Sequence, residues 1–344
     1  MKVGFVYDPI YLKHDTGQHP ENANRLKAIM RYVERAGPWQ QLVPVKPRAA
    51  TTQELSLVHD RKYISHIQEV ADKGGGWLDP DTVVSADSFK VARYAAGGVI
   101  KATDAVMTGE LDSVFALVRP PGHHATAQRA MGFCLFNNVA IAAKYALKKY
   151  GLERIAIIDF DVHHGNGTQA AFYDEPKVLY ISAHQSPHYP GTGSIDEVGD
   201  GRARGTTVNI PLPAGCGDSE YQRVFEQIIV PVVRRFKPQL ILVSAGYDAH
   251  WADELAMMQM TITGFARIVR IIKEMASQLC NGRLILSLEG GYNLTVLSSS
   301  VKAVLDVLVG KTDIEDKLGP PPYGFEPPNI TSLIERIKEI HSLS

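Results

Sequence analysis

Short apolar runs alternate with longer segments of helical periodicity along the chain. The short runs are rich in β-branched residues, as expected for strands that are covered on both faces. The predicted strands are residues 2–8, 113–120, 154–163, 177–184, 206–213, 239–248 and 283–293. The predicted helices are residues 22–37, with Gly37 as the stop, 88–107, 137–151, 218–236, 261–279 and 293–310. This alternation predicts a single α/β domain with a mostly parallel central sheet of about eight strands and helices on both faces.

The Pro-rich stretch GPPPYGFEPPN (319–329) marks the end of this pattern. We therefore assign residues 1–318 to one domain. Residues 319–344 form a linker and a short amphipathic helix over 330–340. We expect that helix to pack on the domain or on a partner subunit.

Four polar clusters stand where predicted strands end. They read PPGHHA (120–125), DFDVHHGNG (159–167), SAGYDAH (244–250) and LEGGYN (288–293). Ligands of open α/β sheets bind outside the carboxyl ends of the strands. Four clusters at four such ends predict one convergent site.

The second cluster places two carboxylates and a histidine in alternation. Residues two apart in a strand share a face, so Asp159, Asp161 and His163 are expected to point the same way. Buried carboxylates must be paired or bound to a metal, whereas strand-end residues that meet solvent need neither. Asp248 adds a carboxylate at another strand end, although a turn or helix cap would also explain it. One nitrogen and two oxygens suit a catalytic zinc site with an open position, and leave Fe²⁺ or Co²⁺ as alternatives.

The remaining clusters offer groups for proton transfer. His123 and His124 are suited to act as general base and acid near neutral pH. Each imidazole needs a partner that fixes its tautomer, and Asp159 and Asn166 are suitable. Tyr292 follows two glycines, and its hydroxyl would stabilise an oxyanion if it is aimed at the substrate carbonyl. A structural histidine and a buried loop tyrosine are the simpler interpretations of each residue alone.

Taken together, these motifs are typical of one protein family. RPPGHHA, DFDVHHGNGTQ, YISAHQ…PGTG, SAGYDAH and LEGGYN resemble the histone deacetylase family, which includes acetylpolyamine amidohydrolases and bacterial acetoin-utilisation proteins. The similarity begins at HPENANRL (19–26) and runs to about residue 310. It implies the arginase/deacetylase-like fold and a metal-dependent amidohydrolase that removes acetyl or other acyl groups from acyl-lysine-like amines.

The resemblance also implies a role for each motif residue. The Zn²⁺ ligands would be Asp161, His163 and Asp248. The catalytic residues would be His124 as general base, His123 as its acid partner, Asp159 and Asn166 as their hydrogen-bond partners, and Tyr292 as the carbonyl-polarising hydroxyl. A structural K⁺ or Na⁺ would be held by Asp159, Asp161, His163, Ser182 and Ala183.

The substrate channel is implied in the same way. Phe133 and Tyr189 would be its walls, with Gly132, Asp81 and Leu255 as further substrate-binding residues. Arg25 would match an arginine deeper in the internal cavity. Two features depart from the common family pattern. Many members carry aspartate in place of Asn166, and an aromatic residue is common in place of His188.

Three alternatives stay open. A polyamine-specific enzyme would need an acidic gatekeeper near the rim, where motif spacing puts Leu255, with Asp253 and Glu254 beside it. A binuclear manganese ureohydrolase of the arginase type needs a further carboxylate two residues beyond the metal-binding histidine, where this chain has Gly165. An acyl-lysine binding scaffold without catalysis would not need the His pair and Tyr292.

Composition narrows the partners and the compartment. The 344 residues carry a formal net charge of −1, so no basic field exists to hold nucleic acid. No apolar run approaches the roughly 20 residues that a membrane helix needs. Three widely spaced cysteines (Cys134, Cys216, Cys280) form no disulfide framework, which favours a reducing, cytoplasmic setting. We expect an acetylated lysine or a small acylated amine as the partner, and a homo-oligomer is left open.

Overall fold

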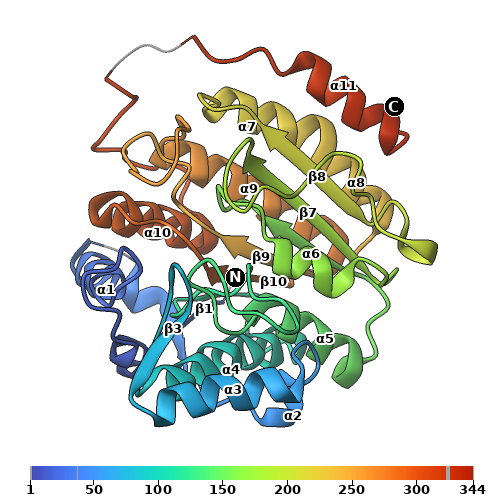
Figure 1. Ribbon diagram of the computed structural model, residues 1–344. Coiled ribbons are helices and arrows are strands. Elements are labelled where there is room, and N and C mark those ends of the chain that lie inside the picture. Colours follow the sequence, from blue (N-terminus) through green and yellow to red (C-terminus); the bar gives the residue numbers. More distant parts are fainter. Residues whose placement is uncertain (1, 37, 323–325, 344) are drawn as a thin grey trace.

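Eight parallel strands form the centre of the computed structural model, which describes residues 2–36, 38–322 and 326–343 (Figure 1). Their order across the sheet is β2-β1-β5-β10-β9-β6-β7-β8, and every neighbouring pair is parallel. The strands are β1 Val3–Val6, β2 Leu42–Val45, β5 Ser113–Ala116, β6 Ile155–Asp159, β7 Val178–Gln185, β8 Thr207–Leu212, β9 Leu240–Ala245 and β10 Leu284–Leu288. The predicted α/β fold is confirmed.

All seven predicted strands are present, although most are shorter than predicted. The eighth, β2, lies at one edge of the sheet and contains Pro44. Proline cannot donate a ladder hydrogen bond and is confined to edges, which explains why the pattern of this strand is broken. A two-stranded antiparallel hairpin outside the main sheet, β3 Gly75–Asp79 with β4 Thr82–Ser85, was also not predicted.

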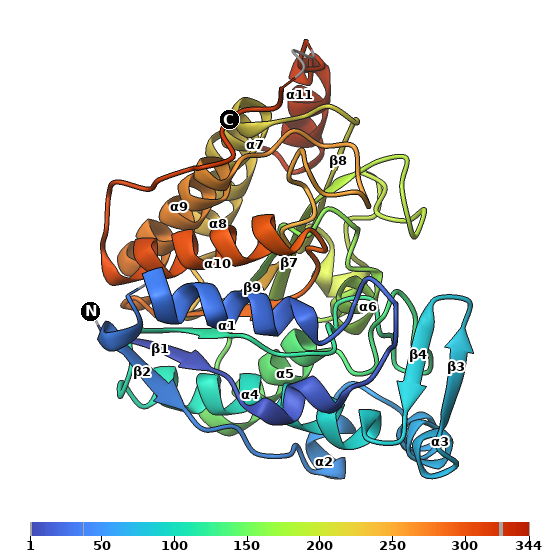
Figure 2. The ribbon, with the colours of Figure 1, turned by 90° about the vertical axis from the view of Figure 1, so that its left-hand side faces the viewer.

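Helices cover both faces of the sheet. Figure 2 shows α1, α10 and α9 on one side and α4 and α5 on the other. The helices are α1 Asn24–Ala36, α2 Thr52–Leu55, α3 Arg61–Asp72, α4 Ser88–Met107, α5 Asn138–Tyr150, α6 Asn166–Phe172, α7 Asp218–Val224, α8 Val230–Phe236, α9 Ile262–Cys280, α10 Leu294–Val309 and α11 Thr331–Ile340, with shorter turns η1 Pro9–Lys13, η2 Trp39–Gln41 and η3 Gly201–Ala203. The predicted stop at Gly37 lies outside the described residues. No helix within the described ranges has the length and apolar character that crossing a bilayer demands.

The predicted helix over 218–236 is interrupted. A π-helical turn, η4 Phe225–Ile229, separates α7 from α8. Pro231 lacks an N–H donor, so an uninterrupted α-helical ladder cannot pass through it. The short helices α2 and α3 were not predicted.

The C-terminal helix α11 packs on the body of its own chain. Ile330, Ile334 and Ile337 are buried, and the helix contacts η4. Arg235 of α8 donates a hydrogen bond to the His341 carbonyl at 2.6 Å. Residues 323–325 of the preceding Pro-rich stretch lie outside the described residues.

The sheet order explains how the four polar clusters meet. Strands β5, β10, β9 and β6 are consecutive neighbours at the centre of the sheet. The clusters PPGHHA, LEGGYN, SAGYDAH and DFDVHHGNG follow these strands in that order. Because the strands are parallel, all four clusters emerge at the same edge.

Candidate active site

Three side chains that could ligate a metal converge beyond β6 and β9. Donor atoms of Asp161, His163 and Asp248 all lie within 4.8 Å of one another. Nδ1 of His163 is 3.0 Å from Oδ1 of Asp161 and 3.3 Å from Oδ2 of Asp248. The expected strand geometry is wrong in one respect, because β6 ends at Asp159. Asp161 and His163 therefore lie in the following loop and not on one face of a strand.

The geometry of this cluster fits a bound cation. Among the described side chains, Oδ2 of Asp248 is a buried oxygen without a hydrogen-bond partner. A Cβ at Gly290 would lie 2.0 Å from that oxygen, and a Cβ at Gly246 would lie 2.1 Å from Oδ2 of Asp161. Glycines at both positions thus leave room for the carboxylates. Burial disfavours the charged imidazole of His163, but the nearby carboxylates of Asp161 and Asp248 outweigh it and raise its pKa to about 10. The two carboxylates therefore favour a positive charge between them, and a bound divalent ion would supply that charge.

The histidine pair of the PPGHHA loop lies beside this cluster. The rings of His123 and His124 are 4.0 Å apart, and the ring of His124 is 6.0 Å from that of His163. Nδ1–H of His123 donates to Oδ2 of Asp159 at 3.1 Å. Nδ1–H of His124 donates to Oδ1 of Asn166, the first residue of α6, at 2.8 Å. Both rings therefore keep Nε2 available for chemistry.

The two histidines have opposite proton affinities. Burial lowers the pKa of His123, but the charges of Asp159 and Asp161 outweigh it and raise that pKa to about 10. Burial, together with the positive charges of His123 and His163, holds the pKa of His124 well below its usual range. Titratable neighbours with pKa values pushed apart are suited to separate acid and base roles.

Aromatic rings stand around the histidines. Tyr189 packs edge-on to His124 at 5.2 Å, and Phe133 packs edge-on to Tyr292 at 5.6 Å. The guanidinium of Arg25 lies 5.0 Å from the centre of the Tyr292 ring. Burial raises the pKa of the Tyr292 hydroxyl well above its usual value, so this hydroxyl stays a hydrogen-bond donor at neutral pH.

The loop that carries Phe133 is tightly held. Gly132 adopts a positive φ of 55°, and a Cβ there would lie 2.3 Å from the His124 ring. Oδ1 of Asp81 accepts the N–H of Gly132 at 3.2 Å. Asp81 thus contacts the loop that carries Phe133 through its carboxylate.

The structure also shows the contacts of the residues expected at the channel rim and at the monovalent ion site. The ring of His188 stacks on that of His163 at 4.9 Å, and its Nε2 lies 2.9 Å from the carbonyl oxygen of Leu255. Ser182 is the registered neighbour of Asp159 across β7 and β6, and Ala183 follows it in β7. The structure thus brings Ser182 next to one of the two aspartates.

Glu289 is a site residue that sequence reasoning missed, although LEGGYN contains it. It is fully buried at the end of β10. Its Oε2 accepts the N–H groups of Gly122 at 2.7 Å and His123 at 3.3 Å, and its Oε1 accepts the Ser244 hydroxyl at 3.0 Å. Burial raises the Glu289 pKa to about 7. A carboxylate directly after an apolar strand was the signal available in the sequence.

A buried network of charged side chains, Glu21, Arg25 and Arg119, also contacts a loop of the site. Glu21 accepts two hydrogen bonds from Arg119, at 2.6 Å and 2.8 Å, and one from Arg25 at 3.1 Å. Burial raises the Glu21 pKa, but the charge and hydrogen bonds of Arg119 outweigh it and lower that pKa to about 2. Nε–H of Arg25 donates to the carbonyl of Gly291 at 2.8 Å. The network therefore ties the segment before α1 to the loop that carries Tyr292.

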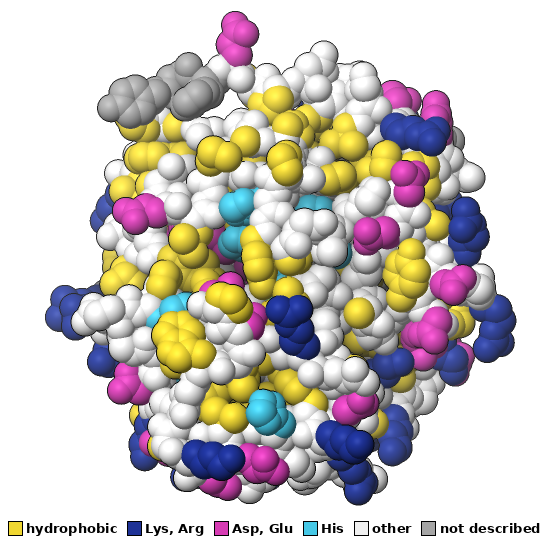
Figure 3. All heavy atoms as spheres, in the orientation of Figure 1, with side chains coloured by type: hydrophobic (Ala, Val, Ile, Leu, Met, Phe, Trp, Pro, Cys, Tyr) yellow, Lys and Arg dark blue, Asp and Glu magenta, His cyan; other side chains and the backbone are white. Residues whose placement is uncertain are grey.

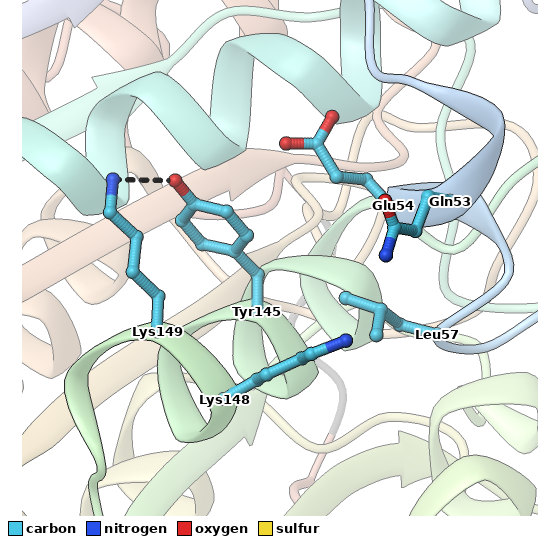
Figure 4. A pocket seen from close by; sticks show the side chains of 6 residues that line it. All are labelled: Gln53, Glu54, Leu57, Tyr145, Lys148 and Lys149. Carbon is cyan, nitrogen blue, oxygen red and sulfur yellow. Dashed lines mark hydrogen bonds between the residues drawn. The ribbon is translucent and has the colours of Figure 1, made fainter.

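A second hollow, of ≈340 Å³, lies between α2 and α5 and away from the motif residues (Figure 4). It is lined by Gln53, Glu54, Leu57, Tyr145, Lys148 and Lys149. Its polar groups are largely paired: Lys149 donates to the Tyr145 hydroxyl at 2.8 Å, and Arg48 binds Glu54. None of the motif residues lines it, so this hollow is separate from the candidate active site.

Comparisons with known proteins agree with this geometry. The family profile described as the histone deacetylase domain matches residues 19–308. The chain is 42% identical to "Histone deacetylase 14, chloroplastic" of Arabidopsis thaliana, over 96% of this chain and 83% of that protein. It is 44% identical to a "Probable deacetylase" of Archaeoglobus fulgidus (86% and 82% covered) and 37% identical to the "Histone deacetylase-like amidohydrolase" of Pseudomonas aeruginosa (92% and 82% covered).

A solved structure agrees as well. The crystal structure of the HDA15 HD domain superposes with a TM-score of 0.89 at 34% identity, covering 99% of this chain and 94% of that one. Fold, motif positions and sequence similarity thus point to the same group of hydrolases. The chain belongs to the histone deacetylase family and is a deacetylase-type hydrolase.

Proposed function

We propose that this protein hydrolyses the acyl amide of acyl-lysine side chains, with Zn²⁺ as the resident metal. One observation carries the proposal: the convergence of Asp161, His163 and Asp248 within 4.8 Å, next to a neutral histidine with a free Nε2. A divalent ion held by these three residues would polarise the substrate carbonyl and lower the pKa of the attacking water. Fe²⁺ and Co²⁺ suit the same oxygen-rich set and are the alternatives.

The protein's own residues then divide the proton transfers. Neutral His124 accepts the proton of the attacking water at Nε2, because its Nδ1–H is engaged by Asn166. The Tyr292 hydroxyl donates a hydrogen bond to the carbonyl oxygen, where negative charge develops. A protonated member of the His pair gives a proton to the leaving nitrogen, and Asp159 stabilises the charged form of His123. Water and the amide thus become acetate and a free amine.

A structural K⁺ or Na⁺ is also proposed, and Asp159, Asp161, His163, Ser182 and Ala183 would hold it. The pairing of Asp159 with Ser182 in adjacent strands supports it. Such an ion would offset the negative charge of the two buried aspartates.

The test is an acyl-substrate panel with enzyme reconstituted separately with Zn²⁺, Fe²⁺ or Co²⁺. We expect turnover of an acetyl-lysine peptide by the Zn²⁺ form. His124→Ala and Tyr292→Phe should lower kcat by about 10²-fold or more. The matched control is His164→Asn, outside the proposed machinery. Unchanged deacetylation in both catalytic variants would refute the assignment.

Polyamine specificity is the second candidate. It is favoured by one observation, the acidic Glu254 beside Leu255 on a hollow that Tyr292 also lines. The first candidate is supported by the apolar Leu255 at the position where motif spacing puts the gatekeeper. A clear preference for N-acetylputrescine over the acetyl-lysine peptide would reverse this order.

We propose a reducing compartment, the cytoplasm in the simplest case. All three cysteines are buried and unpaired, which supports this. Some relatives carry "chloroplastic" in their names, so a plastid is the alternative. Fractionation of cells that express the tagged protein distinguishes the two.

A further inference from the structure

Most of the exposed large hydrophobic side chains of this protein belong to loops and strands that also carry residues of the proposed channel. Within the described ranges these are Val43, Trp77, Tyr189, Met257 and Leu294. All except Val43 stand on segments that also carry channel residues. Histidines lie in the middle of the face drawn in Figure 3, with apolar side chains around them. Apolar groups gathered at one place on a surface mark a binding site more often than scattered ones do.

Trp77 is the most exposed of the four, at 65%. It lies on β3, opposite Val83 of β4. A Cβ at Gly76 would lie 3.5 Å from Val70 of α3, and Leu78 packs on the core, so strand alternation directs Trp77 away from the body.

The hairpin that carries Trp77 is attached to the channel wall. Its turn residue Asp81 accepts the N–H of Gly132, and Thr82 accepts the N–H of Phe133 at 3.2 Å. The ring of His19 packs edge-on to Phe133 at 4.4 Å, and its Nε2–H donates to the carbonyl of Asp81 at 3.1 Å. Trp77 is therefore held at a set position relative to the channel.

The other three side chains are connected to the channel in similar ways. Tyr189 contacts the rings of His124 and His163. Met257, 63% exposed, donates its N–H to Gln185 at 2.8 Å and follows Leu255 by two residues. Leu294 lines a hollow of ≈330 Å³ together with His19, Leu255 and Tyr292.

We propose that Trp77, Tyr189, Met257 and Leu294 form an apolar collar that binds the polypeptide on either side of the acyl-lysine, and that the collar selects peptides with an apolar or aromatic residue next to that lysine. The inference rests on the proposed function. A small acylated amine ends within the channel and gains nothing from the collar. A polypeptide continues beyond the lysine and buries its flanking side chains there, chiefly on Trp77, since aromatic residues dominate such contacts.

The experiment compares three substrates: an acetyl-lysine peptide with leucine or phenylalanine flanks, the same peptide with glycine flanks, and N-acetylputrescine. Wild-type Zn²⁺ enzyme should prefer the apolar-flanked peptide by about tenfold in kcat/KM over the glycine-flanked one. Trp77→Ala should remove this preference through KM, with kcat unchanged, and Trp77→Phe should restore most of it. Val43→Ala, the matched exposed hydrophobic on edge strand β2, should change nothing.

The outcomes separate the inference from the proposed function. Equal losses on all three substrates in Trp77→Ala would show that Trp77 only supports the channel wall, and equal turnover of both peptides would refute the collar. Unchanged kinetics with a dimer that dissociates in Trp77→Ala would make the surface a contact between two copies of this chain. Peptide binding is measured in parallel by fluorescence anisotropy. Trp77-dependent binding without turnover by any metal form would refute the proposed function and keep the collar.

Discussion

Two pairs of adjacent histidines, His123–His124 and His163–His164, stand in loops beyond central strands, yet their four rings have different environments. His123 faces the carboxylate of Asp159, and His163 faces two carboxylates. His124 faces an amide. His164 is buried between the Thr192 hydroxyl at 2.7 Å and the Gln169 side-chain oxygen at 3.0 Å.

The difference shows that partners, and not residue type, separate the roles. Carboxylate partners outweigh burial and raise the pKa of His123 and His163 to about 10. Without such a partner, burial lowers the pKa of His164 to about 4 and that of His124 well below its usual range. His164 faces a polar network, and among the described residues it belongs to no group that could hold a metal, as expected of a structural histidine.

The largest effect is expected from His163, the proposed metal ligand of the second pair. His163→Ala should abolish metal binding and lower kcat/KM by about 10³-fold or more, because two buried carboxylates lose the nitrogen that completes the site. Metal content by mass spectrometry and turnover are the measurements. His164→Asn, one residue away, should retain one Zn²⁺ per chain. Full metal content in His163→Ala would contradict the ligand assignment.

The next largest effect is expected to differ between the two neutral histidines, His124 and His164. His124→Ala should lower kcat by about 10²- to 10⁴-fold with the metal retained, because a general base is lost. His164→Ala should lower kcat by less than about tenfold, since its ring contacts only structural groups. Steady-state kinetics on the acetyl-lysine peptide decide this. Comparable losses in the two variants would mean that the pairs are not divided as described.

A smaller effect concerns the amide partner of His124. Asn166→Asp should raise the pKa of His124, because a carboxylate stabilises the imidazolium while an amide does not. Since the reaction needs neutral His124, the acidic limb of the kcat/KM profile should move to higher pH. Asn166→Ala is the control, because it removes the partner without adding charge. A limb that stays in place in the aspartate variant would exclude His124 as the titrating base.

The smallest effect is on stability. The folded-state pKa of His164 is about 4, below the ordinary value of 6.5, so the unfolded chain binds the extra proton between these pH values. Stability should therefore fall as pH decreases from 7 to 5, by about 2 kcal/mol from this residue alone. His164→Gln should remove this contribution to the pH dependence. The measurement is the free energy of unfolding in urea at pH 7 and at pH 5. An identical pH dependence in the variant would show that folding does not lower the pKa of His164.

The sequence by itself determined the layer architecture and the groups available for chemistry. Short apolar runs that alternate with helical segments indicate which strands are buried. A carboxylate or histidine just after such a run must lie near the end of a buried strand. For this reason Asp161, His163, Asp248 and the His123–His124 pair are recognisable in the linear chain.

Tertiary structure alone decided which groups meet and with what charge. The carboxylate of Glu289 reaches Gly122 across 167 positions, and that of Glu21 reaches Arg119 across 98. Local periodicity carries no information on such pairings. It also did not reveal that β6 stops at Asp159. Proton affinity depends on these partners, which is why His124 and His164 look equivalent to their neighbours in sequence and differ from them in the folded protein.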